Sequence, residues 1–191
     1  QACRTSGMGR MSEPETILRA VVASLQPDGP WRGRTVLISA GATREYIDPV
    51  RFISNPSTGR MGAAIAAAAR RLGARVILVH GHMETAIPAG VETAAAITAK
   101  DMHQAILARA SEADVIIMTA AVGDFRPEIQ SPEKIKKESI GQNWSLSLVR
   151  TADILLELGK IRQSSQKRQP ILVRFAAETA MGDAKRLLNL A

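Results

Sequence analysis

Short apolar runs alternate with helix-like segments along most of the chain, and this alternation limits the possible folds more than any other feature. The runs at 35–40, 75–79 and 114–119 are rich in Val, Ile and Leu, which is typical of strands buried on both faces. Fainter patterns complete the series: strands at 91–94, 144–149 and 171–176, and helices at about 59–72, 101–111 and 153–163. We therefore expect an α/β, Rossmann-like three-layer sandwich with a mostly parallel central sheet.

The composition narrows the class of partner. Lys and Arg number 25 against 18 Asp and Glu, and the formal charge of +7 favours an anionic ligand. The aromatic residues are few (two Trp, one Tyr and three Phe), which argues against a single-stranded nucleic acid stacked on aromatic side chains. No apolar stretch approaches the roughly 20 residues of a membrane span. A single cysteine fits a reducing compartment, and we expect a cytoplasmic protein. Together with the few aromatic residues and the lack of a long apolar stretch, this predicts a protein that binds neither nucleic acid nor membrane.

The connection after the first strand is unusually long. It covers residues 41–58, whereas about 2–6 residues are typical between a strand and the next helix. It leads into small residues from Ser57 to Gly62, where the N–H groups of a helix start attract phosphate. The same residues also suit a helix cap and close helix–sheet packing, so both interpretations stay open. Gly41 stands alone after the strand, and the missing G-x-G-x-x-G pattern counts against a nicotinamide enzyme.

Small residues and an acid follow the run at 114–119. In a parallel sheet, ligands bind where the strands end, so a base or sugar could pack on the backbone of 120–123 and hydrogen-bond to Asp124. A simple turn capped by Asp is the alternative.

A basic segment comes next. Residues 132–137 hold three lysines and suit either a mobile loop that closes over phosphates or plain solvated surface. His80 and His82 lie two residues apart without acidic or cysteine neighbours at ligand spacing, so we expect no metal site there. The sequence assigns no metal ligands.

Six segments, taken together and in this order, resemble the phosphopantothenoylcysteine synthetase family, the ligase part of a bifunctional bacterial enzyme of coenzyme A synthesis. The resemblance covers about residues 34–180 and rests on 38–44, 47–55, 57–62, 120–127, 134–137 and 175–179. It implies a ligase that joins 4'-phosphopantothenate to L-cysteine through an acyl cytidylate, with CTP and Mg²⁺. The fused bacterial layout favours CTP, whereas the residues alone do not separate CTP from ATP.

The resemblance also implies roles for individual residues. Asn55 and Arg51 would contact the acyl and phosphopantothenate groups, and Lys134 would steady the phosphate charge. The implied nucleotide site comprises Gly41, Ser57, Gly59, Gly62, Met118, Thr119, Ala120, Asp124, Lys134, Thr151, Ala152, Asp153, Ile154 and Phe175.

The head of the chain resembles the end of a flavin-dependent decarboxylase, with Cys3 as its proton donor and FMN as its cofactor. We expect a decarboxylase remnant at 1–14, a helical linker at 15–33 and a ligase domain at 34–191. The chain begins with Gln1 and ends on a helical pattern without a stop signal, as a fragment of a longer polypeptide would. The family also implies a homodimer through the ligase domain and a higher oligomer for the full-length protein. A nicotinamide- or flavin-linked oxidoreductase and a non-catalytic nucleotide-binding module are the rival interpretations.

Overall fold

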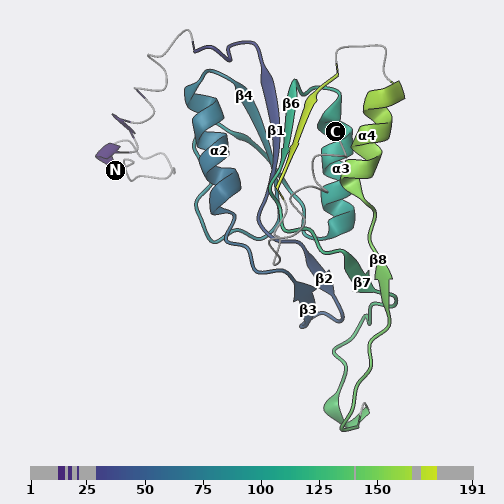
Figure 1. The fold of residues 1–191 in the computed structure, drawn as a ribbon. Helices are drawn as coiled ribbons and strands as arrows, with labels where there is room; N and C mark the ends of the chain where they lie inside the picture. The colour runs from purple at the N-terminus through teal and green to yellow at the C-terminus, as the bar shows by residue number, and fades with distance from the viewer. Residues whose placement is uncertain are drawn as a thin grey trace, which may run out of the picture.

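A computed structural model describes residues 13–15, 17–18, 21, 29–139, 141–164 and 169–175. Five parallel strands form its central sheet, in the order β5-β4-β1-β6-β9. They are β1 (Thr35–Ala40), β4 (Arg75–His80), β5 (Glu92–Ala95), β6 (Val115–Met118) and β9 (Ile171–Arg174). The expected α/β class is confirmed, and this sheet is parallel throughout (Figure 1).

The central strand β1 shows why the apolar runs become buried strands. Five of its six residues are buried, and Leu37 pairs with Ile77 on one side and Ile116 on the other. Burial on both faces requires a helical layer on each side of the sheet. Helix α2 (Arg60–Arg71) lies against one face, and α3 (Ala99–Ala110) and α4 (Ile154–Ser164) cover the other (Figure 1).

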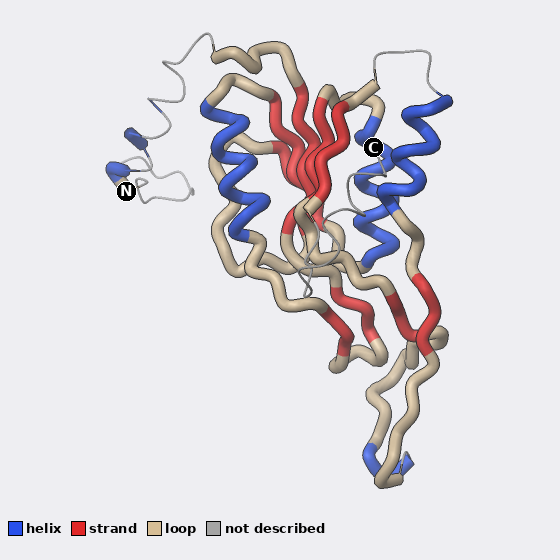
Figure 2. Tube along the Cα trace, viewed as in Figure 1, coloured by secondary structure: helices blue, strands red, loops and turns tan. Residues whose placement is uncertain are grey.

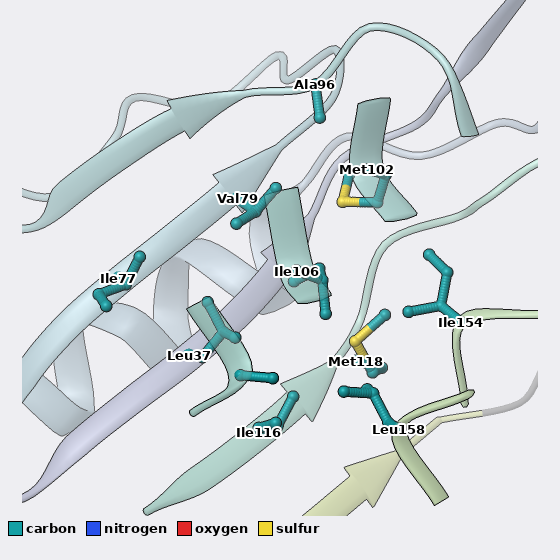
Figure 3. Packing of buried hydrophobic residues seen from close by; sticks show 11 residues of the cluster. Leu37, Ile77, Val79, Ala96, Met102, Ile106, Ile116, Met118, Ile154 and Leu158 are labelled. Carbon is teal, nitrogen blue, oxygen red and sulfur yellow. The ribbon is translucent and has the colours of Figure 1, made fainter. Parts of the chain in front are cut away.

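The two faces of the sheet are packed differently. On the α2 face, small side chains such as Ala66 and Ala69 meet the apolar strand residues Val36, Ile38 and Leu78, so the helix can approach closely. The opposite face carries larger side chains, including Met102 and Ile106 from α3 and Ile154 and Leu158 from α4 (Figure 3).

The chain order across the sheet creates a crevice. From β1 the chain moves outward to β4 and β5, then returns across β1 to β6 and β9. The loops after β1 and β6 therefore leave the sheet side by side in opposite directions. Such a switch point at the carboxyl edge is where open α/β sheets bind ligands.

Two short antiparallel pairs lie below the carboxyl edge (Figure 2). The long connection after β1 contains a hairpin of β2 (Arg44–Tyr46) and β3 (Phe52–Ser54), which its sequence did not indicate. The expected strand at 144–149 forms only from Leu148, as β8 (Leu148–Arg150), and it pairs with β7 (Phe125–Pro127) outside the central sheet. Its alternating pattern leaves Leu148 and Arg150 exposed, which suits a two-stranded ribbon and not a strand covered on both faces.

The segment between β7 and β8 projects from the molecule as an arm (residues 128–147), with residue 140 outside the described part (Figure 1). A hydrogen bond of 3.0 Å from the Glu128 N–H to the Ser147 carbonyl closes its base, and a short 3-10 helix, η1 (Lys137–Ser139), lies within it. The expected basic segment 132–137 therefore belongs to this arm.

Candidate nucleotide and acid site

The loops after β1 and β6 are joined by backbone hydrogen bonds at the switch point. The Ala121 N–H donates to the Gly41 carbonyl at 2.8 Å, and the Thr43 N–H donates to the Ala121 carbonyl at 3.2 Å. Ala42 forms bridges to both Ala121 and His82. The carboxyl edge is therefore an ordered surface, and its loops have a defined position relative to the sheet.

A buried hydroxyl on β1 orients the loop that follows β6. The Ser39 Oγ accepts the backbone N–H groups of Thr119 and Ala120, each at 3.1 Å. The Thr43 Oγ1 accepts the N–H of Gly123 at 2.9 Å. The hydroxyls of Ser39 and Thr43 thus orient the backbone of 119–123, which includes the stretch 120–123 that the sequence predicted to pack against a ligand.

A cavity of about 570 Å³ opens beside this loop. Pockets of roughly 300–1,000 Å³ take molecules of the size of a nucleotide. Its walls come from the loop after β6, the residues that lead into α4, and the end of β9. Eight of the residues that the resemblance assigns to the nucleotide line it: Met118, Ala120, Asp124, Thr151, Ala152, Asp153, Ile154 and Phe175.

Thr151 holds two walls of the cavity together. Its hydroxyl donates to the Gly123 carbonyl at 2.7 Å, and its N–H donates to the Asp124 carbonyl at 2.9 Å. Next to it, the Asp153 Oδ1 accepts the Leu156 N–H at 2.9 Å, at the start of α4. The Asp124 carboxylate is exposed and makes no hydrogen bond with the residues that the structure describes, so it can accept one from a ligand.

Five further residues of this lining received no individual binding role from the sequence, although Val122 was expected to offer its backbone: Val122, Phe125, Arg150, Leu155 and Arg174. The two arginines matter most, because they add positive charge to a cavity proposed for an anion. Their position in the sequence could have indicated them, since Arg150 directly precedes the assigned segment 151–154 and Arg174 directly precedes Phe175.

The glycines assigned to the nucleotide lie outside this lining and are held by close packing. A Cβ added at Gly62 would stand 2.5 Å from the Ala40 Cβ and 2.7 Å from the Thr119 Oγ1. Gly59 has a φ of 73°, and its added Cβ would stand 2.7 Å from the side chain of Met83. The nearby Ser57 Oγ accepts a long hydrogen bond of 3.4 Å from the Gly59 N–H.

These short distances support the interpretation that Gly59 and Gly62 allow helix α2 to pack closely against its neighbours. Nevertheless, Gly62 brings the first turn of α2 next to Thr119 at the switch point, so its N–H groups lie at the carboxyl edge. Helix α2 has no side-chain cap at Gly59. A phosphate could therefore still reach this helix start.

Asn55 stands at the edge of the cavity. Its exposed side chain donates from Nδ2 to the carbonyl of Val122, a lining residue, at 3.3 Å. The hairpin of β2 and β3 carries it there, because Asn55 directly follows β3. Its amide therefore lies beside the wall of the large cavity.

Arg51 and Lys134 are not among the residues that line this cavity. The Arg51 guanidinium pairs with the fully buried carboxylate of Asp48, donates to the Ile135 carbonyl at 2.6 Å and lies 5.1 Å from the Trp144 ring centroid. Because Ile135 and Trp144 belong to the two limbs of the arm, Arg51 clamps the arm. Lys134 adjoins Ile135 and is exposed.

Asp48 is the buried half of this clamp. Its Oδ1 accepts the N–H groups of Val50 and Arg51 at 2.8 Å each, and its Oδ2 accepts the Ile135 N–H at 3.2 Å. Burial by itself raises the pKa of Asp48, but the Val50 N–H, the Arg51 guanidinium and the other donors stabilise the anion more. The pKa of Asp48 therefore lies far below its ordinary value of 3.8.

Asp48→Asn is expected to loosen the arm. Because its pKa is lowered, the ionised Asp48 carboxylate stabilises the folded protein at pH values above about 3.8, which is its ordinary pKa. This stabilisation is lost as the pH falls below that value. The variant should therefore melt at a lower temperature at pH 7 and lose less of its stability than wild type on acidification below that value. Trypsin should also cleave it faster after Lys134, Lys136 and Lys137, as mapped by mass spectrometry.

Asp114→Asn provides the matched control. Asp114 also pairs with an arginine, Arg34 at 3.0 Å, and accepts the Thr35 N–H at 2.9 Å, but it lies at the opposite edge of the sheet. It should lower the melting temperature without changing cleavage in the arm. Equal cleavage of the arm in all three proteins would contradict the clamp.

The doubly wound parallel sheet, with a cavity at its switch point, places this chain in the class of Rossmann-like α/β proteins. Residues 31–187 match the family described as the DNA/pantothenate metabolism flavoprotein C-terminal domain. The chain belongs to this family, which confirms the resemblance found in the sequence.

Individual proteins agree with this membership. The chain is 45% identical over 181 residues to the coenzyme A biosynthesis bifunctional protein CoaBC of Bacillus subtilis (strain 168), covering 93% of this chain and 43% of that protein. It thus spans less than half the length of this relative. A crystal structure of the CoaBC C-terminal domain superposes with a TM-score of 0.68 at 40% identity, over 84% of this chain and 72% of that one.

A more distant structure shares the fold. It is a Cab2 variant in complex with phosphopantothenate-cysteine, with a TM-score of 0.63 at 19% identity, over 91% of this chain and 73% of that one. Two further observations concern only the described residues. None of their helices is long and apolar enough to cross a membrane, and no three of their His, Cys, Asp or Glu side chains gather as metal ligands. Cys3 lies outside the described residues.

Proposed function

We propose that this protein is a phosphopantothenate–cysteine ligase that uses CTP. One observation carries the proposal: a cavity of about 570 Å³ at the switch point is lined by eight of the assigned nucleotide residues and adjoins Asn55. Family membership and the similarity to CoaBC proteins support this function over an oxidoreductase.

The nucleotide would lie in the large cavity with its phosphates toward the sheet edge. Phe175, which is 54% exposed, offers a ring face for the base, and Asp124 offers an acceptor for base or ribose donors. Arg150 and Arg174 supply positive charge, and the start of α2 supplies N–H groups near Thr119. These groups stabilise the charge that develops on the phosphates during transfer.

The reaction would proceed in two transfers. A carboxylate oxygen of 4'-phosphopantothenate attacks the α-phosphorus of CTP, and the bond from that phosphorus to the β-phosphate oxygen breaks, releasing pyrophosphate. The cysteine amine then attacks the acyl carbon of the cytidylate, the bond from carbon to the phosphate oxygen breaks, and CMP leaves. The amine gives up a proton as the amide forms. Asn55 would orient the acyl group in both steps, and exclusion of water would protect the mixed anhydride.

Mg²⁺ fits this proposal as an ion carried by the nucleotide. Magnesium usually binds substrate phosphates together with one or two carboxylates, and Asp124 and Asp153 are the carboxylates of the cavity. When bound, the ion would neutralise charge on the triphosphate. Arg51 and Lys134 enter the proposal through the arm, which would have to bring Lys134 to the phosphates.

The layout of the protein and its partners belong to the same proposal. It includes a decarboxylase remnant at 1–14, a linker at 15–33 and a ligase domain at 34–191. Cys3 would be the proton donor of the FMN-dependent decarboxylation, and the protein would be cytoplasmic. A homodimer is supported by exposed apolar side chains on the two short hairpins and the arm: Val50, Phe52, Phe125, Ile129, Trp144 and Leu148.

The test is pyrophosphate release on mixing the protein with CTP, 4'-phosphopantothenate and L-cysteine, with the product identified by mass spectrometry. We expect release to require the first two substrates, and the thiol-containing amide to appear only with cysteine. Thermal-shift measurements with CTP, ATP and NADPH should show the largest rise in melting temperature with CTP. No release with all three substrates would overturn the ligase, and stabilisation by NADPH alone would favour the oxidoreductase.

A further inference from the structure

Glu45 is a buried acid that the proposed reaction does not use. It is the central residue of β2 and is only 4% exposed. Burying a carboxylate costs free energy unless hydrogen bonds compensate for the lost hydration. The Ala99 N–H donates to the Glu45 Oε1 at 2.7 Å, and this bond is itself buried. The contact therefore resists displacement, because breaking it would leave a buried donor and a buried acceptor apart.

The donor in this contact belongs to the first residue of helix α3. The first N–H groups of a helix have no partner within the helix. The Thr98 hydroxyl accepts one of them, the Asp101 N–H, at 3.1 Å, and Glu45 accepts another from outside the helix. A negative charge is also stabilised by the partial positive charge of a helix start. Glu45 thus joins the hairpin of β2 and β3 to a helix of the central layers.

The other face of β2 gives the hairpin less support. Successive side chains of a strand point to opposite faces, so Arg44 and Tyr46 point away from Glu45. Both line a second, smaller cavity of about 160 Å³. Because packed neighbours are fewer beside a cavity, the position of the hairpin there depends more on discrete hydrogen bonds. These are the Glu45 bond and the bond of 2.8 Å from the Arg44 N–H to the Ile97 carbonyl.

The hairpin leads directly to the large cavity. Glu45 pairs with Ile53 across the two strands, and Asn55 follows two residues later. The Asn55 Nδ2 donates to the Val122 carbonyl at 3.3 Å, at the wall of that cavity. Glu45 also lies close to the same loop, because a Cβ added at Gly123 would stand 3.3 Å from its Cγ. A shift of the hairpin would therefore displace the Asn55 amide.

We propose that Glu45 is a positioning residue for the transfer steps, because it holds the Asn55 amide at the wall of the large cavity through the hairpin. The inference rests on the proposed function, from which it takes the role of Asn55. A misplacement of about 1 Å can slow an enzyme reaction by about 100-fold. Loss of the Glu45 bond should therefore slow product formation without weakening CTP binding.

Glu45→Ala and Glu45→Gln test the proposal by turnover. Alanine removes the acceptor, whereas glutamine keeps an oxygen that can accept the Ala99 N–H. We expect Glu45→Ala to lower kcat by about 10- to 100-fold with unchanged affinity for CTP, and Glu45→Gln to keep most of the wild-type rate. If Glu45→Ala does not fold, Glu45→Asp replaces it, because its shorter side chain cannot reach Ala99 unless the hairpin moves. The same loss of kcat is expected.

Asp101→Ala is the matched control. It removes another hydrogen bond at the same helix start, the bond of 2.9 Å from the Thr98 N–H to the Asp101 Oδ2. It should lower the melting temperature and leave kcat unchanged. Equal losses of kcat in Asp101→Ala and Glu45→Ala would overturn the inference, because both variants would then act by weakening the helix.

A double variant shows whether Glu45 acts through Asn55. Two residues that act through one contact have effects that do not add. In the Asn55→Ala background, Glu45→Ala should therefore cause no further loss of kcat. A second loss of about 10- to 100-fold in the double variant would contradict the positioning role.

NMR of the Asn55 side-chain amide gives a readout that needs no reaction. Glu45→Ala should shift this resonance, because the bond to Val122 changes, and Asp101→Ala should not. If the shift occurs but the wild-type protein forms no product, the ligase fails and the hold of Glu45 on Asn55 stands. If product forms and Glu45→Ala matches wild type in both kcat and the Asn55 resonance, the inference fails and the ligase stands.

Discussion

Asn55→Ala is expected to reduce product formation by about 100- to 1,000-fold while leaving CTP binding largely intact, because the amide would act on the acyl group during transfer. The Asn55 side chain is exposed and donates to Val122 at the edge of the large cavity, so its removal should not disturb the core. The variant therefore separates binding of the nucleotide from chemistry on the acid. Pyrophosphate release measures the chemistry, and calorimetry with CTP measures the binding.

Gln104→Ala is the control for this prediction. Gln104 also carries an exposed amide, but it lies on α3, away from both cavities. Its activity and CTP affinity should match wild type. Equal turnover in Asn55→Ala and wild type would refute the assigned role, and a large loss of CTP affinity would place Asn55 in the nucleotide site instead.

Gly41→Ala is expected to cost about 2–5 kcal/mol of folding stability, from left-handed strain of about 1–2 kcal/mol and a clash of about 1–3 kcal/mol. Gly41 has a φ of 75°, and an added Cβ would stand 2.3 Å from the His82 carbonyl oxygen. That oxygen belongs to the backbone and accepts the Ala42 N–H at 3.0 Å, so it cannot move away without breaking the carboxyl edge. Urea unfolding followed by circular dichroism measures the loss.

Gly33→Ala isolates the steric part of this effect. Gly33 has a nearly identical φ of 76°, yet nothing lies within 4 Å of an added Cβ. It should cost only the conformational strain, about 1–2 kcal/mol. Equal losses of stability in the two variants would mean that the carboxyl edge absorbs the extra methyl group, contrary to the packing described.

The local patterns predicted most elements of the central sheet. The strand at 35–40 and the helix near 59–72 are found almost at the expected bounds, because each depends on apolar spacing within a few residues. The helix expected at 101–111 begins earlier, at Ala99. Thr98 forms a capping box with Asp101, and the buried Glu45 accepts the Ala99 N–H at 2.7 Å. The second contact crosses 54 residues, so local spacing could not indicate it.

The candidate site was predicted only in part. Residues that follow a strand directly, such as Ala120 and Phe175, were found at the carboxyl edge because a parallel sheet gathers its strand ends there. The contact of Arg51 with the substrate stays a prediction, and its clamp on the arm was not foreseen, since its partners Asp48, Ile135 and Trp144 come from separate segments. The assigned glycines are closely packed, and their contact with a nucleotide stays a prediction.

The sequence by itself determined the α/β class, the family and the edge of the sheet that carries the candidate site, because apolar periodicity and short motifs are local properties. The tertiary structure alone decided which loops share a cavity, since this depends on the strand order β5-β4-β1-β6-β9. That order brings Arg44, His80 and Ala96 together around one small space and leaves the two limbs of the arm clamped by Arg51. Contacts between distant segments follow from packing in three dimensions, and neighbouring residues along the chain do not encode them.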